Sequence, residues 1–241
     1  MKTYKIHLIR HGLTKNNFDG TYLGQLDVPV CEEGLAQLKQ MKEEMTYPEV
    51  GAVFSSPLIR CKQTAEILYP DQPPIIINEF KEYNFGEWEG KTADDLKDDE
   101  LFKAWLSGGP DECPPFGESN AAFGKRIAEA FQKVVEGLFK TGVTDAAIIT
   151  HGGVIMSIMS MFALPEAAMT DWLTPNGCGY TIRVTPSLWT KIYKAEAIEE
   201  IPYIEPTEEE EAAYLQSNPD LDAFGNQLSG FGFIDLEEQD D

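Results

Sequence analysis

A largely apolar run that ends in a cation, an imidazole and a glycine most constrains how this chain folds. The run Ile6 to Ile9 is followed at once by Arg10, His11 and Gly12. Such a run is typical of a buried strand that delivers polar groups at its carboxyl end, where ligands collect in open α/β sheets. Arg10 offers a planar fork of donors suited to phosphate oxygens. His11 offers a ring nitrogen that can act as a nucleophile or a base near neutral pH.

Strand and helix patterns alternate along the rest of the chain. The first strand is expected at residues 4–9, and later ones at 51–54, 75–77 and 146–149. Helical spacing of apolar residues predicts helices at 32–45, 119–139 and 154–162, with short ones at 92–97 and 99–106. The pattern predicts a three-layer α/β/α fold with a mostly parallel central sheet and a site at the carboxyl ends of its strands.

Two boundaries are predicted from local turn and capping signals. Ser55-Ser56-Pro57 is typical of a helix start, so Ser56 is expected to cap a helix that runs to about Tyr69. Residues 180–185 and 189–195 alternate in polarity on either side of Pro186-Ser187, which predicts a hairpin.

Composition places the chain among ordinary globular proteins. It has 241 residues, 42% hydrophobic and 25% charged, without an apolar run long enough to cross a bilayer. At the N-terminus, Arg10 and His11 come too early to leave room for the apolar core of a signal peptide. Four cysteines are scattered without a Cys-x-x-Cys pair, which favours reduced thiols in the cytoplasm over a disulfide framework or a zinc site. We therefore expect no membrane partner, and a homo-oligomer remains possible.

The net charge of −22 is concentrated near the C-terminus. Residues 195–241 hold fifteen acidic residues and no Lys or Arg, which leaves 26 acidic against 19 basic residues in the first 194. Neither part has the basic surface of a nucleic-acid binder. The sequence thus predicts an α/β domain at 1–197 and an acidic extension at 198–241. Aromatic and aliphatic residues in the extension indicate that much of it docks on the domain.

Three strand ends supply polar groups of one kind. Arg10 and His11 follow the first strand, His151 follows the strand at 146–149, and Arg60 lies in the first turn of the helix after the second strand. Helical side chains lean toward the N-terminus, so Arg60 can reach the free amides that favour an anion there. Gly152 opens another helix and could add a backbone donor. These groups would form a phosphoryl pocket that needs no metal or other cofactor.

With these groups and a set of short motifs, the chain resembles the histidine phosphatase superfamily, the phosphoglycerate-mutase-like proteins. The resemblance covers about residues 4–162. The matching segments, in the family's order, are Arg10-His11-Gly12-x-Thr14 with Asn17, Gly24-x-x-Asp27-x-Pro29, Glu32-x-Gly34, Ser55-Ser56-Pro57-Leu58-x-Arg60 with Gln63-Thr64-Ala65, Glu82-Tyr83-Asn84-Phe85-Gly86-x-Trp88-Glu89-Gly90, Gly117-Glu118-Ser119 and Thr150-His151-Gly152-Gly153.

The resemblance implies a role for each matched residue. His11 would be phosphorylated, and Arg10, Arg60 and His151 would hold the phosphoryl oxygens. Glu82 would protonate the leaving oxygen, and its segment is similar to the phosphatase branch rather than the mutase branch. Leu13 and Cys31 replace residues that are usually polar in the family, so a relative's substrate does not transfer directly. Residues 80–119 would cover the substrate.

Several residues keep two interpretations. Asn17 could contact the phosphate or cap a turn. Glu79, Glu87 and Glu89 lie near Glu82 in the sequence, and Glu82 is favoured as the acid on the family match. His7, inside a strand, is expected to be a neutral packed histidine. At the level of function, a phosphomonoesterase that acts on a small phosphorylated metabolite through phosphohistidine is favoured. A phosphoglycerate mutase and a non-catalytic phospho-ligand scaffold are the alternatives.

Overall fold

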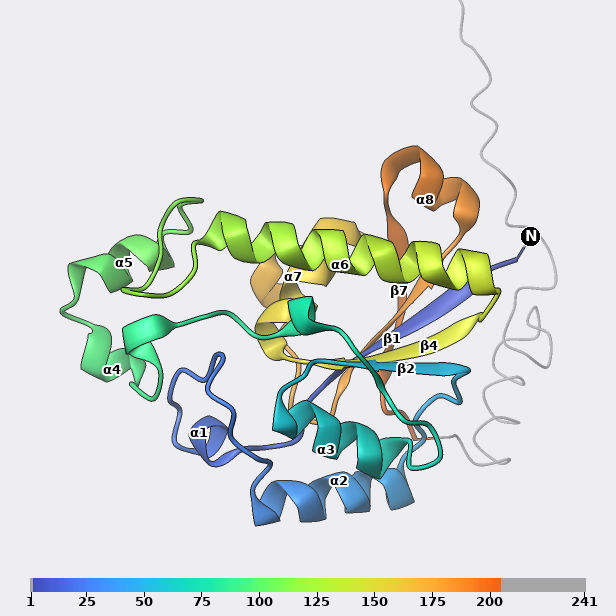
Figure 1. Ribbon diagram of the computed structural model, residues 1–241, viewed down its shortest axis with the longest axis horizontal. Helices are drawn as coiled ribbons and strands as arrows, with labels where there is room; N and C mark the ends of the chain where they lie inside the picture. Colours follow the sequence, from blue (N-terminus) through green and yellow to red (C-terminus); the bar gives the residue numbers. More distant parts are fainter. Residues whose placement is uncertain (1, 205–241) are drawn as a thin grey trace, which may run out of the picture. The chain divides into compact units, whose positions relative to one another are not determined.

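Seven strands form one sheet in the computed structural model, which describes residues 2–204. Their order is β3-β2-β4-β1-β6-β7-β5 (Figure 1). Four neighbouring pairs are parallel, and only β6 runs antiparallel to its neighbours β1 and β7. The predicted mostly parallel sheet is therefore confirmed. The strands are β1 (Tyr4–Arg10), β2 (Ala52–Ser55), β3 (Ile75–Ile76), β4 (Asp145–Thr150), β5 (Ala163–Leu164), β6 (Gly179–Val184) and β7 (Ala195–Ile201).

Helices cover both faces of the sheet, which gives the predicted three layers. Helices α6 (Asn120–Thr141) and α7 (Gly152–Phe162) lie on one face, and α2 (Glu32–Glu44) and α3 (Ile59–Leu68) lie on the other (Figure 1). Successive side chains of a strand point to opposite faces. Ile6 and Leu8 of β1 accordingly pack into the core cluster that includes α6 and α7, whereas Ile9 joins the cluster that includes α3.

The longest helix, α6, follows from its apolar spacing and its ends. Ser119 caps it by accepting a hydrogen bond from the backbone N–H of Ala122 at 3.2 Å. Gly142 ends it with a left-handed φ of 77°. Its buried face carries Phe123, Ile127, Phe131, Val134 and Leu138.

Residues 78–119 form an excursion between β3 and α6. The two short helices that the sequence predicts are present as α4 (Ala93–Leu96) and α5 (Glu100–Leu106). Trp88 and Phe102 are buried in a small separate core, against which Tyr22 packs from the loop after α1 (Lys15–Phe18). Two short 3-10 helices, η1 (Asn78–Phe80) and η2 (Gly86–Trp88), precede α4 and α5 in the chain.

The hairpin predicted near the end of the domain is wrong in one arm. Residues Pro186–Ile192 form helix α8, and the strand that pairs with β6 is β7. Proline suits the first turn of a helix, and Trp189 is buried against the rings of Phe131 and Phe162. The alternation at 189–195 therefore reflects one buried helical face. Strand β5 and the 3-10 helix η3 (Met169–Trp172) were not predicted.

The compact unit that holds this sheet ends at Tyr203, so β7 crosses the boundary expected at residue 197. The expected docking of the acidic extension falls on 205–241, outside the described residues. No helix among residues 2–204 is long and apolar enough to cross a membrane.

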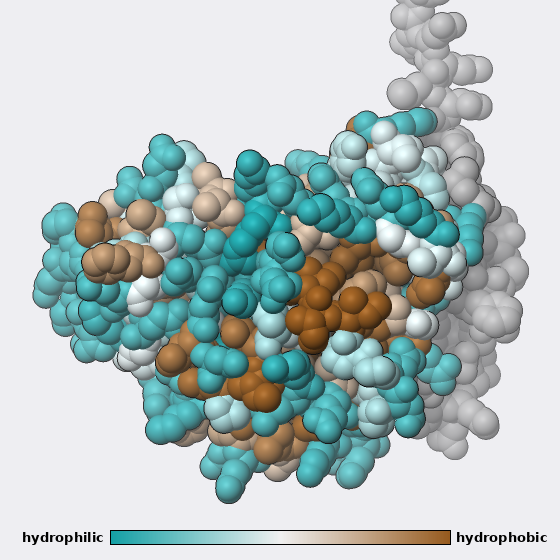
Figure 2. Space-filling model, in the orientation of Figure 1, coloured by the Kyte–Doolittle hydropathy of each residue, from teal (hydrophilic) through white to brown (hydrophobic). Residues whose placement is uncertain are grey.

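Figure 2 shows apolar residues gathered beside α6, in the region of the edge strand β3, where Ile75 and Ile76 are 55% and 44% exposed.

Candidate active site

The carboxyl ends of β1 and β4 place two imidazoles side by side. Arg10 and Thr150, the last residues of these strands, are partners in the parallel register, so the next residues, His11 and His151, emerge together. Their ring centroids lie 5.2 Å apart in an edge-to-face arrangement. Both side chains are buried, at 3% and 0% exposure.

His11 is held as a neutral imidazole with one nitrogen unengaged. Its Nδ1 lies 2.7 Å from the carbonyl oxygen of Gly12, which can only accept, so Nδ1 carries the proton. No hydrogen bond recorded within residues 2–204 uses Nε2, whose lone pair is therefore available. Burial, and then the charges of Arg60 and Arg10, lower the pKa of His11 well below its usual value. A neutral ring with a free Nε2 is the form that can attack phosphorus.

His151 has neighbours at its nitrogens. Its Nε2 lies 2.8 Å from Oγ of Ser56 and 3.5 Å from Sγ of Cys61. Burial, followed by the charge of Arg60, lowers the pKa of His151 well below its usual value. Burial also raises the pKa of Cys61 to about 12, so the thiol stays protonated.

The expected capping role of Ser56 is wrong. Helix α3 begins at Ile59, three residues after Ser56. The serine hydroxyl accepts the N–H of Leu58, before the helix, at 3.4 Å, and its shorter contact is with His151. The cap comes from a distant loop, because Oδ1 of Asp27 accepts the backbone N–H of Ile59 at 2.6 Å. Arg60 still lies in the first turn of α3, as predicted.

Both arginines are held by backbone carbonyls rather than by acids. Arg10 donates from Nη1 to the carbonyl of Thr174 at 2.7 Å. Arg60, fully buried, donates from Nη1 and Nη2 to the carbonyls of Leu26 and Gly24 at 2.8 and 2.6 Å. Within residues 2–204, the buried Nε of each lacks a partner and neither guanidinium forms an ion pair with a carboxylate. Buried cations without an internal counter-ion favour an anionic ligand.

Glu89 stabilises the loop that supplies these carbonyls. Its carboxylate accepts the backbone N–H groups of Gly24 and Gln25 at 2.9 and 2.7 Å. Gly24 has no room for a side chain, since a Cβ would lie 2.0 Å from the carbonyl oxygen of Tyr83. Arg60 is therefore positioned by a loop that the segment from Tyr83 to Glu89 holds in place.

Glu82 lies at the same pocket, 7% exposed. Its two carboxyl oxygens accept the backbone N–H groups of Tyr83 and Gly153 at 2.8 and 2.9 Å. Burial raises the pKa of Glu82, although these two hydrogen bonds and the charges of Arg60 and Arg10 oppose the rise. A carboxyl group with a raised pKa beside a phosphoryl site is suited to donate a proton.

A fork of hydrogen bonds from Arg126 of α6 fixes the backbone on both sides of this acid. Its guanidinium donates to the carbonyls of Glu79, Lys81 and Glu82 at 2.6, 2.7 and 2.9 Å. It also pairs with Glu118 at 2.6 Å. The segment from Glu79 to Glu82 is therefore anchored to α6.

Asn17 and Gly152 are the remaining predicted site residues. Thr14 and Asn17 cap α1 reciprocally, which confirms the turn-capping interpretation of Asn17 and leaves its contact with phosphate a prediction. Gly152 is the first residue of α7, and a Cβ there would lie 3.5 Å from Nε of Arg10. The Cα of Gly152 therefore lies close to the guanidinium of Arg10.

The supporting residues were missed because their roles are long-range. Thr174 and Asn176 lie in the loop before β6. From the sequence alone, Arg126 is indistinguishable from an exposed cation on the polar face of an amphipathic helix. Asp27 and Glu118 belong to motif segments that the resemblance matched, but nothing in the local sequence assigns them a partner. A hydrogen bond to a backbone carbonyl leaves no residue-type signal.

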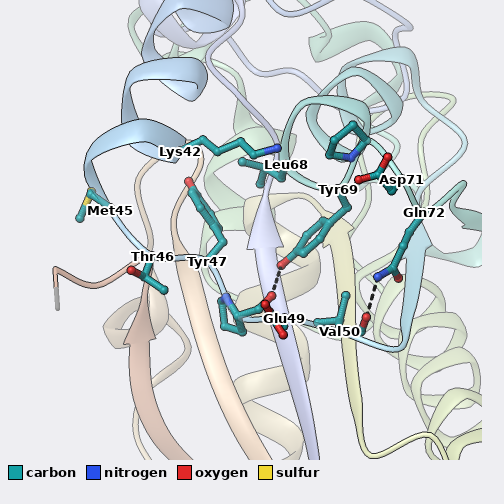
Figure 3. Close-up of a pocket in the computed structure, with 12 residues that line it drawn as sticks. Lys42, Met45, Thr46, Tyr47, Glu49, Val50, Leu68, Tyr69, Asp71 and Gln72 are labelled. Atoms are coloured by element: carbon teal, nitrogen blue, oxygen red, sulfur yellow. Dashed lines mark hydrogen bonds between the residues drawn. The ribbon is translucent and has the colours of Figure 1, made fainter.

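A separate cavity of about 530 Å³ lies between the ends of α2 and α3 (Figure 3). Tyr47 and Tyr69 contribute to its walls, and Tyr69 donates to the carbonyl of Pro48 at 3.2 Å. None of the predicted site residues lines it. Tyr47 also donates to the carbonyl of Gly177 at 2.8 Å.

Comparison with known proteins identifies the family. Residues 6–194 match the histidine phosphatase superfamily (branch 1), so the chain belongs to it. The adenosylcobalamin/alpha-ribazole phosphatase of Salmonella typhi is 28% identical over 200 residues, which cover 80% of this chain and 98% of the relative. A 2,3-bisphosphoglycerate-dependent phosphoglycerate mutase of Bifidobacterium longum is 27% identical over 192 residues, 66% of this chain and 77% of the relative.

A solved structure shows the same architecture. The putative alpha-ribazole-5'-P phosphatase from Escherichia coli K-12 superposes with a TM-score of 0.69 at 26% identity, covering 85% of this chain and 99% of that chain. The family resemblance seen in the sequence is confirmed. The chain is thus a phosphoric monoester hydrolase of the histidine phosphatase type, which acts through a phosphohistidine intermediate.

Proposed function

We propose that His11 carries the phosphoryl group and that Glu82 is the acid and base of the reaction, with a small phosphorylated metabolite as substrate. The observation that carries the assignment is the unengaged Nε2 of His11, since Nδ1 is committed to the Gly12 carbonyl. At His151, by contrast, Nε2 contacts Ser56. The two histidines are therefore not equivalent.

In the first step, Nε2 of His11 attacks phosphorus opposite the ester oxygen and the P–O bond breaks. The leaving oxygen takes the proton of the Glu82 carboxyl. Arg10, Arg60 and His151 would hold the equatorial oxygens, with the amides of Asn17 and Gly152 adding donors. Phosphoryl transfer depends mainly on such positioning and charge stabilisation. The guanidinium groups of Arg10 and Arg60 supply the positive charge that a metal ion would otherwise provide. We therefore expect turnover without a metal.

In the second step, water attacks the phosphohistidine. The Glu82 carboxylate accepts a proton from that water, the P–N bond breaks, and its electron pair returns to Nε2 of His11. Phosphate leaves, and Glu82 is again protonated for the next cycle. One carboxyl group thus serves both half-reactions.

The test is transient labelling with a ³²P-phosphomonoester in the presence of a chelator. His11→Ala should abolish acid-labile label, whereas His151→Ala, which keeps the nucleophile, should label slowly. Glu82→Gln should accumulate label from an activated aryl phosphate, because hydrolysis of the intermediate lacks its base. Label retained in His11→Ala and lost in His151→Ala would reverse the assignment.

The substrate is best sought among the compounds for which the relatives are named. A phosphate-release panel should contain alpha-ribazole-5'-phosphate, phosphoserine and 3-phosphoglycerate. A parallel mutase assay with 2,3-bisphosphoglycerate tests the alternative, which the 27% identical mutase supports. Mutase turnover that exceeds phosphate release would favour that alternative.

All four cysteines are unpaired, which supports a reducing, cytoplasmic setting.

A further inference from the structure

The loop before β6 contacts the residues at the carboxyl end of β1. The carbonyl of Thr174 accepts a hydrogen bond from Arg10, and the backbone N–H of Gly177 donates to the carbonyl of Arg10 at 3.0 Å. Between them, Nδ2 of Asn176 donates to the carbonyl of His11 at 2.9 Å and to Oδ1 of Asn17 at 3.2 Å. Asn176 is thus the one side chain of this loop that contacts both the nucleophile's backbone and a predicted phosphate donor.

The side-chain oxygen of Asn17 is fully engaged. Besides Asn176, the backbone N–H and the hydroxyl of Thr14 donate to Oδ1 at 3.2 and 3.0 Å. No hydrogen bond recorded within residues 2–204 uses Nδ2 of Asn17, and the side chain is half-buried. An amide oxygen with three donors cannot rotate away without placing its NH₂ group against them. The free N–H groups of Asn17 therefore point away from Thr14 and Asn176.

Asn176 also has both amide hydrogens committed. One is used for the His11 carbonyl and the other for Asn17, so a single planar group fixes the distance between the two. A donor left without its partner, or an acceptor without its donor, costs more than the hydrogen bond itself contributes. Removing Asn176 would therefore leave the His11 carbonyl without this donor and the Asn17 amide held by Thr14 alone, which gives that amide more rotational freedom.

We propose that Asn176 is a positioning residue for phosphate capture. It holds the Asn17 amide with its N–H groups toward the phosphoryl oxygens, and its bond to the His11 carbonyl anchors Asn176 for that role. This inference rests on the proposed function, since it assumes that the pocket receives a phosphoryl group. Asn176 acts through Asn17 and does not itself contact the anion.

A double-mutant cycle tests the coupling, with binding of inorganic phosphate measured by calorimetry. Asn17→Ala and Asn176→Ala should each weaken binding roughly tenfold, as the loss of one charge-assisted hydrogen bond implies. The double variant should bind within about twofold of Asn17→Ala, because an amide already absent cannot be mispositioned. Additive losses would overturn the proposal.

Phosphate binding is read without turnover, so the cycle remains informative if the proposed reaction fails. Asn16→Ala is the matched control, because this neighbouring asparagine donates to Thr21 and has no contact with the pocket. It should bind phosphate like the parent. If Asn176→Ala does not fold, Asn176→Leu approximates the shape and removes both donors without adding a charge. Binding by Asn176→Leu equal to that of the parent would also overturn the proposal.

Discussion

The carboxyl of Glu82 and the backbone of Gly153 are in direct contact: Oε2 accepts the Gly153 N–H at 2.9 Å, and a Cβ on Gly153 would lie 2.5 Å from Oε1. The first turn of α7 therefore orients the proposed acid as well as presenting His151. A side chain at position 153 would displace the carboxyl, whereas one at position 152 would make ordinary contact with Arg10.

Gly153→Ala should separate protonation of the leaving group from phosphate binding. We expect kcat/KM for an alkyl phosphate to fall about 100-fold, the lower range of a general acid's contribution. An activated aryl phosphate, which needs no proton, should lose much less. Gly152→Ala is the comparison. Its loss of kcat/KM should be similar for the alkyl and the aryl phosphate. Equal losses for both esters in Gly153→Ala would contradict the contact's proposed role.

The pH dependence of kcat/KM should report two groups. Glu82 must be protonated, and burial raises its pKa, so activity on an alkyl phosphate is lost as pH rises through that pKa. His11 must be neutral, and its pKa is lowered, so activity is lost as pH falls below that pKa. The ratio of alkyl to aryl kcat/KM cancels the His11 limb, and the same ratio in Glu82→Gln accounts for the different ionisation of the two esters. Relative to that variant, the ratio in the parent should fall with rising pH; the same pH dependence in both would exclude Glu82 as the acid.

Arg126→Lys should loosen the segment that carries the acid. Lysine keeps the charge but cannot make the fork that joins Glu79, Lys81, Glu82 and Glu118. We expect the free energy of unfolding to drop by about 2 kcal/mol and alkyl-phosphate turnover by roughly tenfold. Denaturant titration and steady-state kinetics measure the two effects. Lys125→Ala, one residue earlier on the exposed side of α6, should change neither. Full activity in Arg126→Lys would show that the fork is dispensable.

The sequence predicts well which residues meet at the candidate site, because these parts are local. Arg10, His11 and His151 follow directly from strands, and Arg60 from the first turn of a helix, so periodicity and strand order place them at one sheet edge. The remainder depends on contacts between distant segments. Asp27 rather than Ser56 caps α3, and Asn176 reaches His11 across 165 positions. Trp189 was misassigned because a short helix with one buried face alternates much as a strand does.

His7 should make the fold sensitive to acid. It is buried on β1, with Nδ1 2.9 Å from Oγ1 of Thr181 and Nε2 without a partner in the described part of the chain. Burial lowers its pKa to about 4, below the unfolded value of 6.5. Its stabilising contribution is therefore complete above pH 6.5 and lost as pH falls toward 4, by up to about 3 kcal/mol.

The paired variant His7→Leu with Thr181→Val removes the titrating ring without orphaning the hydroxyl. Urea unfolding of parent and variant at pH 7 and pH 4.5 isolates the contribution of His7 to the pH dependence of stability, because the two proteins share all other titrating groups. The difference in stability between the two pH values should be smaller in the variant. An equal difference would show that His7 does not titrate with folding.

Carbonyl oxygens rather than carboxylates hold Arg10 and Arg60, and this has a consequence for the end of the catalytic cycle. A carbonyl carries no net charge, so the positive charge in the pocket persists when the substrate's alcohol has left. Inorganic phosphate, the product, meets the same two cations that attracted the ester. The feature that favours binding of the ester should therefore also favour binding of the product, so we expect inorganic phosphate to inhibit the enzyme competitively.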